Sequence, residues 1–326
     1  MKAVKIELKQ AQKVKEELTR KNILDYNYKI IKEKKYIYFP LKKNVNEYKI
    51  VNKKFITKEK TKNLKEYLEN RLNSREINKI NNSFEIVGNV AIIELDESLE
   101  DKKNEIAEAI LKVNKNVNTV AKKIGTREGI YRLLNYEIIK GNKTLETIHK
   151  ENGLRFKLDL SKTYFTAKLS TERIRIAKQV KENETVLVMF SGIAIYPITI
   201  SKYSKAKEIY GIEINPEACK YAEENLIINK IKNVKLYCGD VRHIVPNLPI
   251  KFDKIIMPLP KTSKEYLELA FSILNKDGVI YLYIFIDDDK FKEKIKELKQ
   301  KYKIINIIKA GQTRPRSYRY CIELRL

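Results

Sequence analysis

Two carboxylates in the C-terminal half of the chain stand where a parallel sheet would present a ligand. Glu213 ends the apolar segment IYGIEI, 21 residues after Gly192, and Asp240 ends the segment VKLYCGD. Ligands of open α/β sheets bind outside the carboxyl ends of the strands, and an acid at this spacing takes the ribose hydroxyls of a bound nucleoside. The pair therefore predicts a nucleoside-containing cofactor, with Glu213 at the ribose and Asp240 at the adenine amino group.

The loop around Gly192 narrows the choice of cofactor. A dinucleotide fold requires the pattern G-x-G-x-x-G after its first strand. The segment FSGIAIYP contains only Gly192. With so few glycines to admit a pyrophosphate, the two acids favour S-adenosylmethionine over NAD. The alternative is that both acids only cap the helices that follow them, because acidic residues stabilise helix starts.

The elements that must position these residues lie in 172–326. Short apolar segments alternate there with helical stretches, which predicts a doubly wound, Rossmann-like parallel sheet in an α/β fold. After a helix at about 288–302, two strands follow without an intervening helix, so we expect an antiparallel strand at the sheet edge. The expected parallel strands are 185–190, 209–214, 234–240, 252–259 and 278–286.

Two further domains precede this sheet. Residues 1–60 contain an alternating segment, a helical stretch and the strand-like YIYF, which together predict a small α/β domain. Residues 61–171 contain several alternating strands, including one in which Phe156, Leu158 and Leu160 share a face. We therefore expect a β-rich α+β domain at 61–171, followed by the sheet domain at 172–326.

The charge of the chain indicates a polyanionic partner. Lysine and arginine number 67 and aspartate and glutamate 42, so 67 − 42 gives a net charge of +25. A surplus of this size is typical of nucleic-acid binding proteins. Near the C-terminus, Arg314, Arg316 and Arg319 are interspersed with Tyr318 and Tyr320, as binding to RNA loops favours. The alternatives are a general enrichment in lysine, isoleucine and asparagine, and an exposed basic edge strand.

Cysteine and hydropathy patterns exclude other classes of protein. Cys219, Cys238 and Cys321 form no C-x-x-C pair, and the two histidines are far apart. We therefore predict no disulfide scaffold and no metal site. No apolar run reaches the roughly 18–20 residues that span a bilayer, and the start MKAVKIELKQ has no apolar signal segment. We expect a cytoplasmic protein with no membrane contact and no obligatory protein partner.

Seven ordered segments carry a family resemblance: YRLLNYEIIKG, TIHKENG, TYFTAKLSTERIR, MFSG, EINPEA, GDVR and IIMPLPK. Together with the pattern of the N-terminal domain, they resemble the archaeal and eukaryotic tRNA (guanine-N1)-methyltransferases, which modify the purine 3′ of the anticodon. The resemblance covers nearly the full length. It implies a class I methyltransferase domain that uses S-adenosylmethionine, a β-rich domain before it, and a first domain that touches the outer corner of tRNA.

The resemblance also implies roles for individual residues. The family's catalytic glutamate falls on Glu172, the arginine held against the guanine on Arg132, and the proline loop on Pro258 and Pro260. With the strand ends described above, the implied cofactor residues are Tyr164, Phe190, Gly192, Glu213, Ile214, Asp240, Val241 and Pro258. The implied RNA-binding residues are Lys168, Arg173, Lys261, Arg314 and Arg316.

Three positions depart from the family pattern. Val188 stands where an acid is usual, and Ala194 and Ile195 replace the glycine and proline of the cofactor loop. These two departures alter the expected contacts to the methionine end of the cofactor. Lys168 stands where the family has arginine, so a compact ammonium group replaces a planar guanidinium group that can donate two parallel hydrogen bonds.

The chemistry explains why a base and a cation are needed. Guanine N1 carries a proton, and the charge that develops when it leaves is shared with O6. Glu172 could take the proton, a contribution of about 10²–10⁴ in rate. Arg132 could neutralise the charge on O6, worth roughly 10²–10³. Without the family, the simpler interpretations are an acid at a helix start, worth about 0.3–1 kcal/mol, and a solvated strand residue.

Three functions therefore remain in view. The first is a tRNA guanine N1-methyltransferase. The second is a wyosine-pathway enzyme, bifunctional or dedicated, that methylates a tricyclic guanine derivative or transfers an aminocarboxypropyl group to it. The third is a non-catalytic RNA-binding protein, which Ala194 and Ile195 in the cofactor loop keep open.

Overall fold

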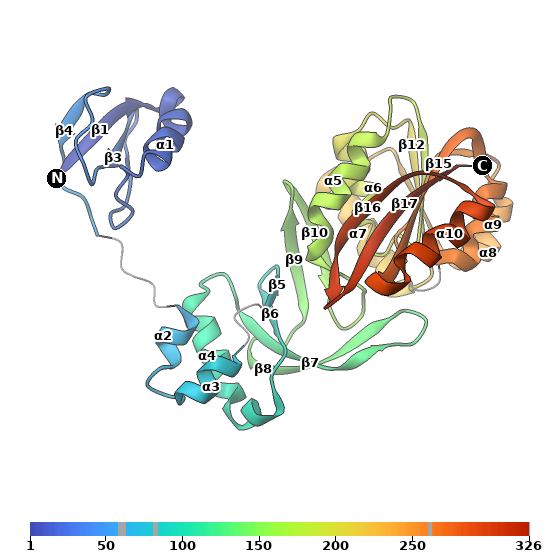
Figure 1. Cartoon of the computed structure of the whole chain (residues 1–326), viewed down its shortest axis with the longest axis horizontal. Coiled ribbons are helices and arrows are strands. Elements are labelled where there is room, and N and C mark those ends of the chain that lie inside the picture. Colours follow the sequence, from blue (N-terminus) through green and yellow to red (C-terminus); the bar gives the residue numbers. More distant parts are fainter. Residues whose placement is uncertain (58–62, 81–83, 260–262, 326) are drawn as a thin grey trace. The chain divides into compact units, whose positions relative to one another are not determined.

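The computed structural model describes residues 1–57, 63–80, 84–259 and 263–325. They form two compact units, Met1–Tyr67 and Leu68–Leu326 (Figure 1). Apart from its first residues, 61–67, the predicted domain 61–171 falls within the second unit, as does the predicted domain 172–326. A single hydrophobic core joins them, because Phe156 and Leu158 pack together with Ile198 and Ala222. The short helix α2 (Leu64–Leu68) lies at the division between the two units.

The first unit is the small α/β domain that the sequence predicts. Its antiparallel sheet has the order β2-β3-β1-β4. Val14 and Leu18 lie four residues apart on one side of α1, so both pack against sheet residues such as Val4 and Phe39. Its elements are β1 (Lys2–Glu7), η1 (Leu8–Gln10), α1 (Ala11–Arg20), β2 (Ile31–Lys32), β3 (Tyr36–Pro40) and β4 (Ile50–Asn52).

The second unit begins with a β-rich region. Its four-stranded sheet has the order β5-β6-β7-β8, and the hairpin of β5 and β6 turns at Gly88, whose φ is +57°. Strands β9 and β10 form a separate antiparallel pair. The elements are α3 (Ser74–Lys79), β5 (Glu85–Val87), β6 (Val90–Ile93), η2 (Glu97–Lys102), α4 (Lys103–Val113), β7 (Thr119–Glu128), β8 (Leu133–Gly141), β9 (Glu146–Glu151) and β10 (Leu154–Asp159).

The rest of the second unit is the predicted doubly wound sheet. Its order is β13-β12-β11-β14-β15-β17-β16. The first five strands are parallel, β17 pairs antiparallel with β15, and the edge strand β16 pairs antiparallel with β17. The antiparallel edge expected from the sequence is thus confirmed. The strands are β11 (Thr185–Met189), β12 (Glu208–Glu213), β13 (Val234–Cys238), β14 (Phe252–Met257), β15 (Leu274–Asp287), β16 (Lys303–Arg314) and β17 (Ser317–Arg325).

Helices cover both faces of this sheet, which explains the uninterrupted apolar strand TVLVM. In β11, Val186 and Val188 face one core, and Leu187 and Met189 face the other. The first face holds η3 (Ala167–Leu169), α5 (Ser170–Gln179), α6 (Ile195–Tyr203) and α7 (Pro216–Asn229). The second face holds α8 (Val241–Ile244), η4 (Val245–Asn247), η5 (Ser263–Tyr266), α9 (Leu267–Ser272), η6 (Asp288–Lys290) and α10 (Phe291–Lys301) (Figure 1).

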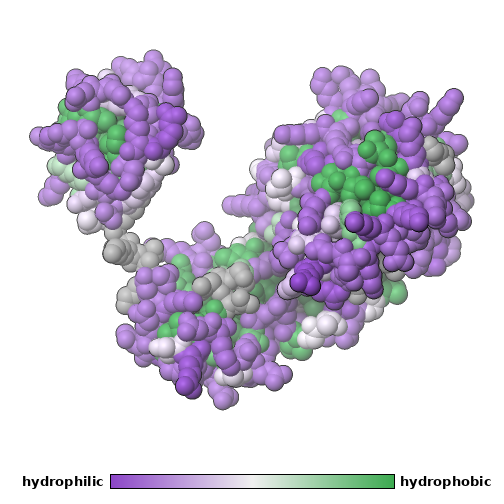
Figure 2. All heavy atoms as spheres, in the orientation of Figure 1, coloured by the Kyte–Doolittle hydropathy of each residue, from purple (hydrophilic) through white to green (hydrophobic). Residues whose placement is uncertain are grey.

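The face of the chain that Figure 2 draws is largely polar. Figure 2 shows hydrophilic residues over most of the drawn face, with smaller hydrophobic areas between them. Among the described residues, no helix is long and apolar enough to cross a membrane. The hydrophilic cover agrees with the large share of charged residues in the sequence.

Candidate active site

A cavity lies at the carboxyl ends of β11, β12 and β14, where the turn between β7 and β8 reaches the sheet. Parallel strands bring their carboxyl ends to one edge, so loops far apart in sequence meet there. This first cavity is lined by Ile130, Tyr131, Arg132, Tyr164, Phe190, Gly192, Glu213, Ile214, Asn215, Ala218, Pro258 and Leu259. A second cavity has five lining residues in common with the first, namely Ile130, Arg132, Phe190, Ile214 and Leu259.

Glu213 lies in the first cavity, as the strand-end argument predicts. Its carboxylate accepts hydrogen bonds from the backbone N–H of Gly192 at 2.7 Å and of Asn215 at 2.9 Å. Burial raises the pKa of this carboxyl group, and the backbone hydrogen bonds oppose that shift. A carboxylate has about four acceptor positions, so Glu213 can still accept the hydroxyls of a ribose.

The cofactor loop after β11 contains three residues with positive φ. Gly192 has a φ of +58°, which favours glycine, and Phe190 and Ala194 each have a φ of +62°. Ala194 occupies the helix-start position where the resembled family has glycine. The loop therefore keeps a glycine-like backbone course although the second glycine is replaced.

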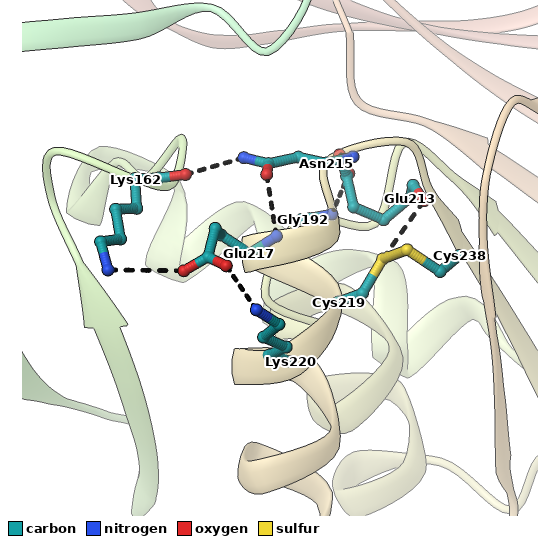
Figure 3. The surroundings of a disulfide bond; sticks show 8 residues. All are labelled: Lys162, Gly192, Glu213, Asn215, Glu217, Cys219, Lys220 and Cys238. Carbon is teal, nitrogen blue, oxygen red and sulfur yellow. Dashed lines mark hydrogen bonds and ion pairs between the residues drawn. A yellow bond between two sulfur atoms is a disulfide. The ribbon is translucent and has the colours of Figure 1, made fainter.

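Asn215 caps the start of α7, as an asparagine followed by a proline at the first helical position indicates in the sequence. Its side chain accepts from the N–H of Glu217 at 3.0 Å, and Pro216 occupies the first helical position. The same side chain donates to the carbonyl of Lys162 at 2.7 Å (Figure 3). The start of α7 is thereby fixed to the segment that leads to Tyr164, on the other wall of the cavity.

Asp240 both caps a helix and lines a cavity, the two alternatives that the sequence left open for it. It caps α8 by accepting from the N–H of Arg242 at 2.8 Å, and it lines the second cavity with Val241. The hydrogen bond from the Arg242 side chain lowers the pKa of the Asp240 carboxyl. The carboxylate therefore stays ionised and can accept a hydrogen bond from an adenine amino group.

Replacing Glu213 or Asp240 by alanine is expected to weaken S-adenosylmethionine binding by about 1–3 kcal/mol, the scale of a lost hydrogen bond to a charged group. Isothermal titration calorimetry measures this affinity directly. Glu217→Ala is the matched control, because Glu217 is an acid in the first turn of α7, four residues after Glu213, but pairs with Lys162 and Lys220 and does not line the cavity (Figure 3). Unchanged affinity in both test variants would remove the site.

A disulfide joins Cys219 in α7 to Cys238 at the end of β13 (Figure 3). The sequence predicted no disulfide scaffold, and one bond is not a scaffold, but the sequence analysis did not anticipate this bond. The two residues are 19 positions apart, and neighbouring strands bring α7 and β13 to the same edge. The bond ties together two elements that flank the cavities. Cys321 is a buried free thiol.

Reduction of the Cys219–Cys238 bond is expected to destabilise the chain by about 3 kcal/mol, because the crosslink restricts the unfolded state over a loop of this length. Thermal unfolding with and without dithiothreitol measures the effect. The Cys219→Ser/Cys238→Ser variant should match the reduced wild type and should not respond to the reductant. Equal unfolding temperatures of oxidised and reduced wild type would contradict the prediction.

Arg132 reaches the cavity from the turn between β7 and β8, where its φ is +54°. Its guanidinium carbon lies 5.6 Å from the centre of the Tyr164 ring, and that of Arg127 lies 4.2 Å from it. Arg127 also donates to the carbonyl of Arg132 at 3.2 Å. Burial lowers the pKa of Arg132, and the charges of Arg127 and Arg319 lower it further. Sequence reasoning missed Arg127, which no motif distinguishes.

Glu172 does not line either cavity, so the structure does not bring it together with Arg132. It lies in the first turn of α5, where it is buried. Its carboxylate accepts from Arg175 Nε and Nη2, both at 2.7 Å, and from the Tyr283 hydroxyl at 2.6 Å. Its role as a base stays a prediction.

Arg173 corrects a prediction made from the sequence. The residue was expected to bind RNA, but its side chain is 2% exposed and forms a buried ion pair with Glu151. It also donates to the carbonyl of Thr166. A guanidinium enclosed in this way holds α5 against β9 and cannot contact a phosphate.

The remaining predicted residues fall into three groups. Lys168, Arg314 and Arg316 are exposed, and Arg314 pairs with Asp287 at 3.3 Å. Tyr164, Phe190, Ile214 and Pro258 line the first cavity. Pro260 and Lys261 lie outside the described residues. Within the described part of the chain, no three histidine, cysteine, aspartate or glutamate side chains are grouped so that they could hold a metal ion.

Comparison with known proteins identifies the relatives of the chain. Residues 147–308 match the TRM5/TYW2 methyltransferase domain, 64–144 the TYW2 N-terminal domain, and 3–49 the tRNA methyltransferase 5 N-terminal domain. The chain is 38% identical over 341 residues to tRNA (guanine(37)-N(1))-methyltransferase Trm5b of Pyrococcus abyssi, covering 99% of this chain and 98% of that one.

Two further comparisons bear on the site. The Taw22 protein of Nanoarchaeum equitans, a tRNA (guanine(37)-N(1))/4-demethylwyosine(37)-methyltransferase, is 31% identical over 267 residues, or 66% of this chain and 88% of that one. The structure of Methanocaldococcus jannaschii Trm5 in complex with adenosine superposes with a TM-score of 0.66 at 28% identity, covering 100% of this chain and 99% of that one.

The doubly wound sheet with a cavity at its strand ends is a Rossmann-like fold, and the matched methyltransferase domain makes the chain a class I methyltransferase. The 38% identity to Trm5b of Pyrococcus abyssi, over nearly the whole length of both chains, identifies the family. The chain belongs to the TRM5/TYW2 methyltransferase family.

Proposed function

We propose that this chain methylates N1 of the guanosine 3′ of the anticodon in tRNA, with S-adenosylmethionine as the donor. The observation that carries the proposal is the full-length similarity to Trm5b of Pyrococcus abyssi. The cavity supports it, because Arg132 lines the same space as Glu213 and Gly192. An S-adenosylmethionine-dependent tRNA methyltransferase also accounts for the net charge of +25.

The cavity residues fit the cofactor. Glu213 has acceptor positions left for ribose hydroxyls, and Asp240 offers an ionised carboxylate for the adenine amino group. The positive φ of Gly192 turns the chain sharply after β11, so this loop forms one wall of the cavity. When bound, the cofactor supplies a methyl group on a sulfonium that is already a good leaving group, so no metal or further acid is required.

The guanine requires two groups from the protein. We assign Arg132 to O6, because its partly buried guanidinium would offset negative charge in a medium less polar than water. We assign Glu172 to the N1 proton on the family resemblance. Arg175 and Tyr283 hold its carboxylate in one orientation beside the sheet. This assignment requires the guanine to approach the first turn of α5.

The experiment for this proposal uses two tRNA transcripts that differ at one base. The purified chain is incubated with labelled S-adenosylmethionine and a transcript with guanosine at position 37, or with the same transcript carrying adenosine there. Label is expected only in the guanosine transcript. Label in both, or in neither, would contradict the proposed site of methylation.

A second candidate is action on the tricyclic wyosine precursor, alone or in addition. The observation that favours it is the match of 64–144 to the TYW2 N-terminal domain, together with the similarity to the bifunctional protein of Nanoarchaeum equitans. Label transferred to a tRNA that already carries the tricyclic base would support this activity.

A further inference from the structure

Arg127 lies in a bulge near the end of β7. The register of β7 against β8 shifts between Ile124 and Glu128, because three residues of β7, 125–127, lie opposite one residue of β8. Bulges of this kind redirect side chains and are common beside active sites. Arg127 is half-buried, although Thr126 and Glu128 on either side of it are exposed. The bulge thus turns one long side chain of an exposed segment inward.

The guanidinium group of Arg127 connects two segments that are far apart in sequence. Its Nη1 donates to the backbone carbonyl of Arg132 at 3.2 Å, and its Nη2 donates to the backbone carbonyl of Phe165 at 3.4 Å. Its guanidinium carbon lies 4.2 Å from the centre of the Tyr164 ring, whose face attracts cations. Arg132 and Tyr164, one from each segment, both line the first cavity. One side chain therefore joins two walls of the candidate active site.

The backbone of Arg132 has a conformation that needs support from its surroundings. Its φ is +54°, in the left-handed region that residues other than glycine disfavour. The N–H of Arg132 donates to the carbonyl of Gly129 at 3.1 Å, and its carbonyl accepts the hydrogen bond from Arg127. A strained conformation at a functional site persists only where neighbouring contacts hold it. The side chain of Arg127 supplies one of these contacts.

The alternative is that Arg127 binds the substrate or the cofactor directly, because it also lines the second cavity together with Asp240. An arginine that binds a phosphate or carboxylate presents parallel N–H groups to its two oxygens. In Arg127 both terminal nitrogens already donate to backbone carbonyls of the chain itself. These contacts favour a role in holding the protein segments over a role in binding an anion.

We propose that Arg127 is a positioning residue for methyl transfer, which holds the β7–β8 turn against the segment 164–165 so that Arg132 faces O6 of the guanine. The proposal rests on the proposed function, because that function assigns Arg132 to O6. Arg127 itself touches neither the reacting base nor the cofactor. Its replacement therefore changes the rate of transfer only through Arg132.

The first test is a double-mutant cycle of single-turnover rates at saturating S-adenosylmethionine and tRNA. We expect Arg127→Met to be about 10- to 100-fold slower than the wild type, because a small displacement of a catalytic group has an effect of this size. The variant with both Arg127→Met and Arg132→Ala should be no slower than Arg132→Ala alone, since the residue through which Arg127 acts is then absent. Losses that multiply in the double variant, or an unchanged rate in Arg127→Met, would overturn the proposal.

The matched control for charge is Lys123→Met. Lys123 lies on the same strand, where it pairs with Glu94, and its replacement also removes one positive charge. The rate of methyl transfer by Lys123→Met should stay near that of the wild type. A loss as large as that of Arg127→Met would show that only the charge of β7 matters, and would contradict the proposal.

Arg127→Lys separates the geometry of the guanidinium group from its charge. Lysine keeps the positive charge, but its single nitrogen does not reproduce the planar fork that reaches both carbonyls. We therefore expect Arg127→Lys to transfer methyl nearly as slowly as Arg127→Met. A wild-type rate in Arg127→Lys would overturn the proposal. Weaker binding of tRNA or S-adenosylmethionine by Arg127→Met, with an unchanged rate at saturation, would also overturn it and assign Arg127 to binding.

Hydrogen exchange measured by mass spectrometry tests the connection without any activity. Backbone amides in 129–132 and 164–166 should exchange faster in Arg127→Met than in the wild type or in Lys123→Met, because the two segments open more readily once their link is lost. Unchanged exchange in both segments would overturn the proposal. Failure of the proposed function is distinguishable, since it would show as an absence of methyl transfer to guanosine by the wild-type chain, whereas exchange reports on the link itself.

Discussion

Glu172→Gln is expected to lower the single-turnover rate of methyl transfer by about 10²-fold or more, because an amide cannot accept the N1 proton of guanine. The affinities for S-adenosylmethionine and tRNA should stay close to those of the wild type, since Glu172 lines neither cavity. Raising the pH should partly restore the rate, because more guanine is then deprotonated by solvent. Rapid-quench measurements across a pH series give these rates.

A structural role for Glu172 must be separated from catalysis, because its carboxylate is bound to Arg175 and Tyr283. Glu323→Gln is the matched control. Glu323 is also buried and accepts from Arg175 Nη1 at 2.7 Å. Both variants lose one charged contact to Arg175, so their unfolding temperatures should fall by similar amounts. A rate loss of equal size in both variants would show that Glu172 serves the ion-pair network and not the reaction.

Arg132→Ala is expected to lower the rate by roughly 10²–10³-fold, because the variant lacks the positive charge that offsets the developing charge on O6. In contrast to Glu172→Gln, raising the pH should give no comparable recovery. The measurement is again a single-turnover rate at saturating cofactor, with the affinity for S-adenosylmethionine determined separately because Arg132 lines the same cavity as Glu213.

The control for Arg132 is Lys123→Ala. Lys123 lies on the same strand-turn-strand segment but pairs with Glu94. The Lys123→Ala variant lacks one positive charge but keeps the cavity unchanged, so its rate of methyl transfer should remain near that of the wild type. If Arg132→Ala transferred methyl at the wild-type rate, the assignment of Arg132 to O6 would be wrong.

Local signals in the sequence were sufficient for the fold of the sheet domain. The alternation of apolar segments and helical stretches placed β11 to β15, and Asn215 with Pro216 marked the start of α7. The spacing of Glu213 from Gly192 predicted their proximity, and the two residues are joined by a hydrogen bond. These features depend on neighbours along the chain or on the general geometry of parallel sheets, which a sequence expresses directly.

Contacts between distant segments could not be read in the same way. Arg173 donates a hydrogen bond to Glu151, 22 residues away in sequence, and Glu172 accepts one from Tyr283, 111 residues away. The Cys219–Cys238 disulfide depends on α7 and β13 meeting at one edge. No residue type or spacing marks these pairs.

The central claim is that the chain methylates N1 of guanosine 37 in tRNA. Its most direct test is mass spectrometry of the nucleosides released from a tRNA transcript after incubation with the wild-type chain and S-adenosylmethionine. We expect 1-methylguanosine, equal in amount to the cofactor consumed, and located at position 37 by nuclease mapping. Cofactor binding without any methylated guanosine, or transfer only to the tricyclic base of a pre-modified tRNA, would contradict the claim.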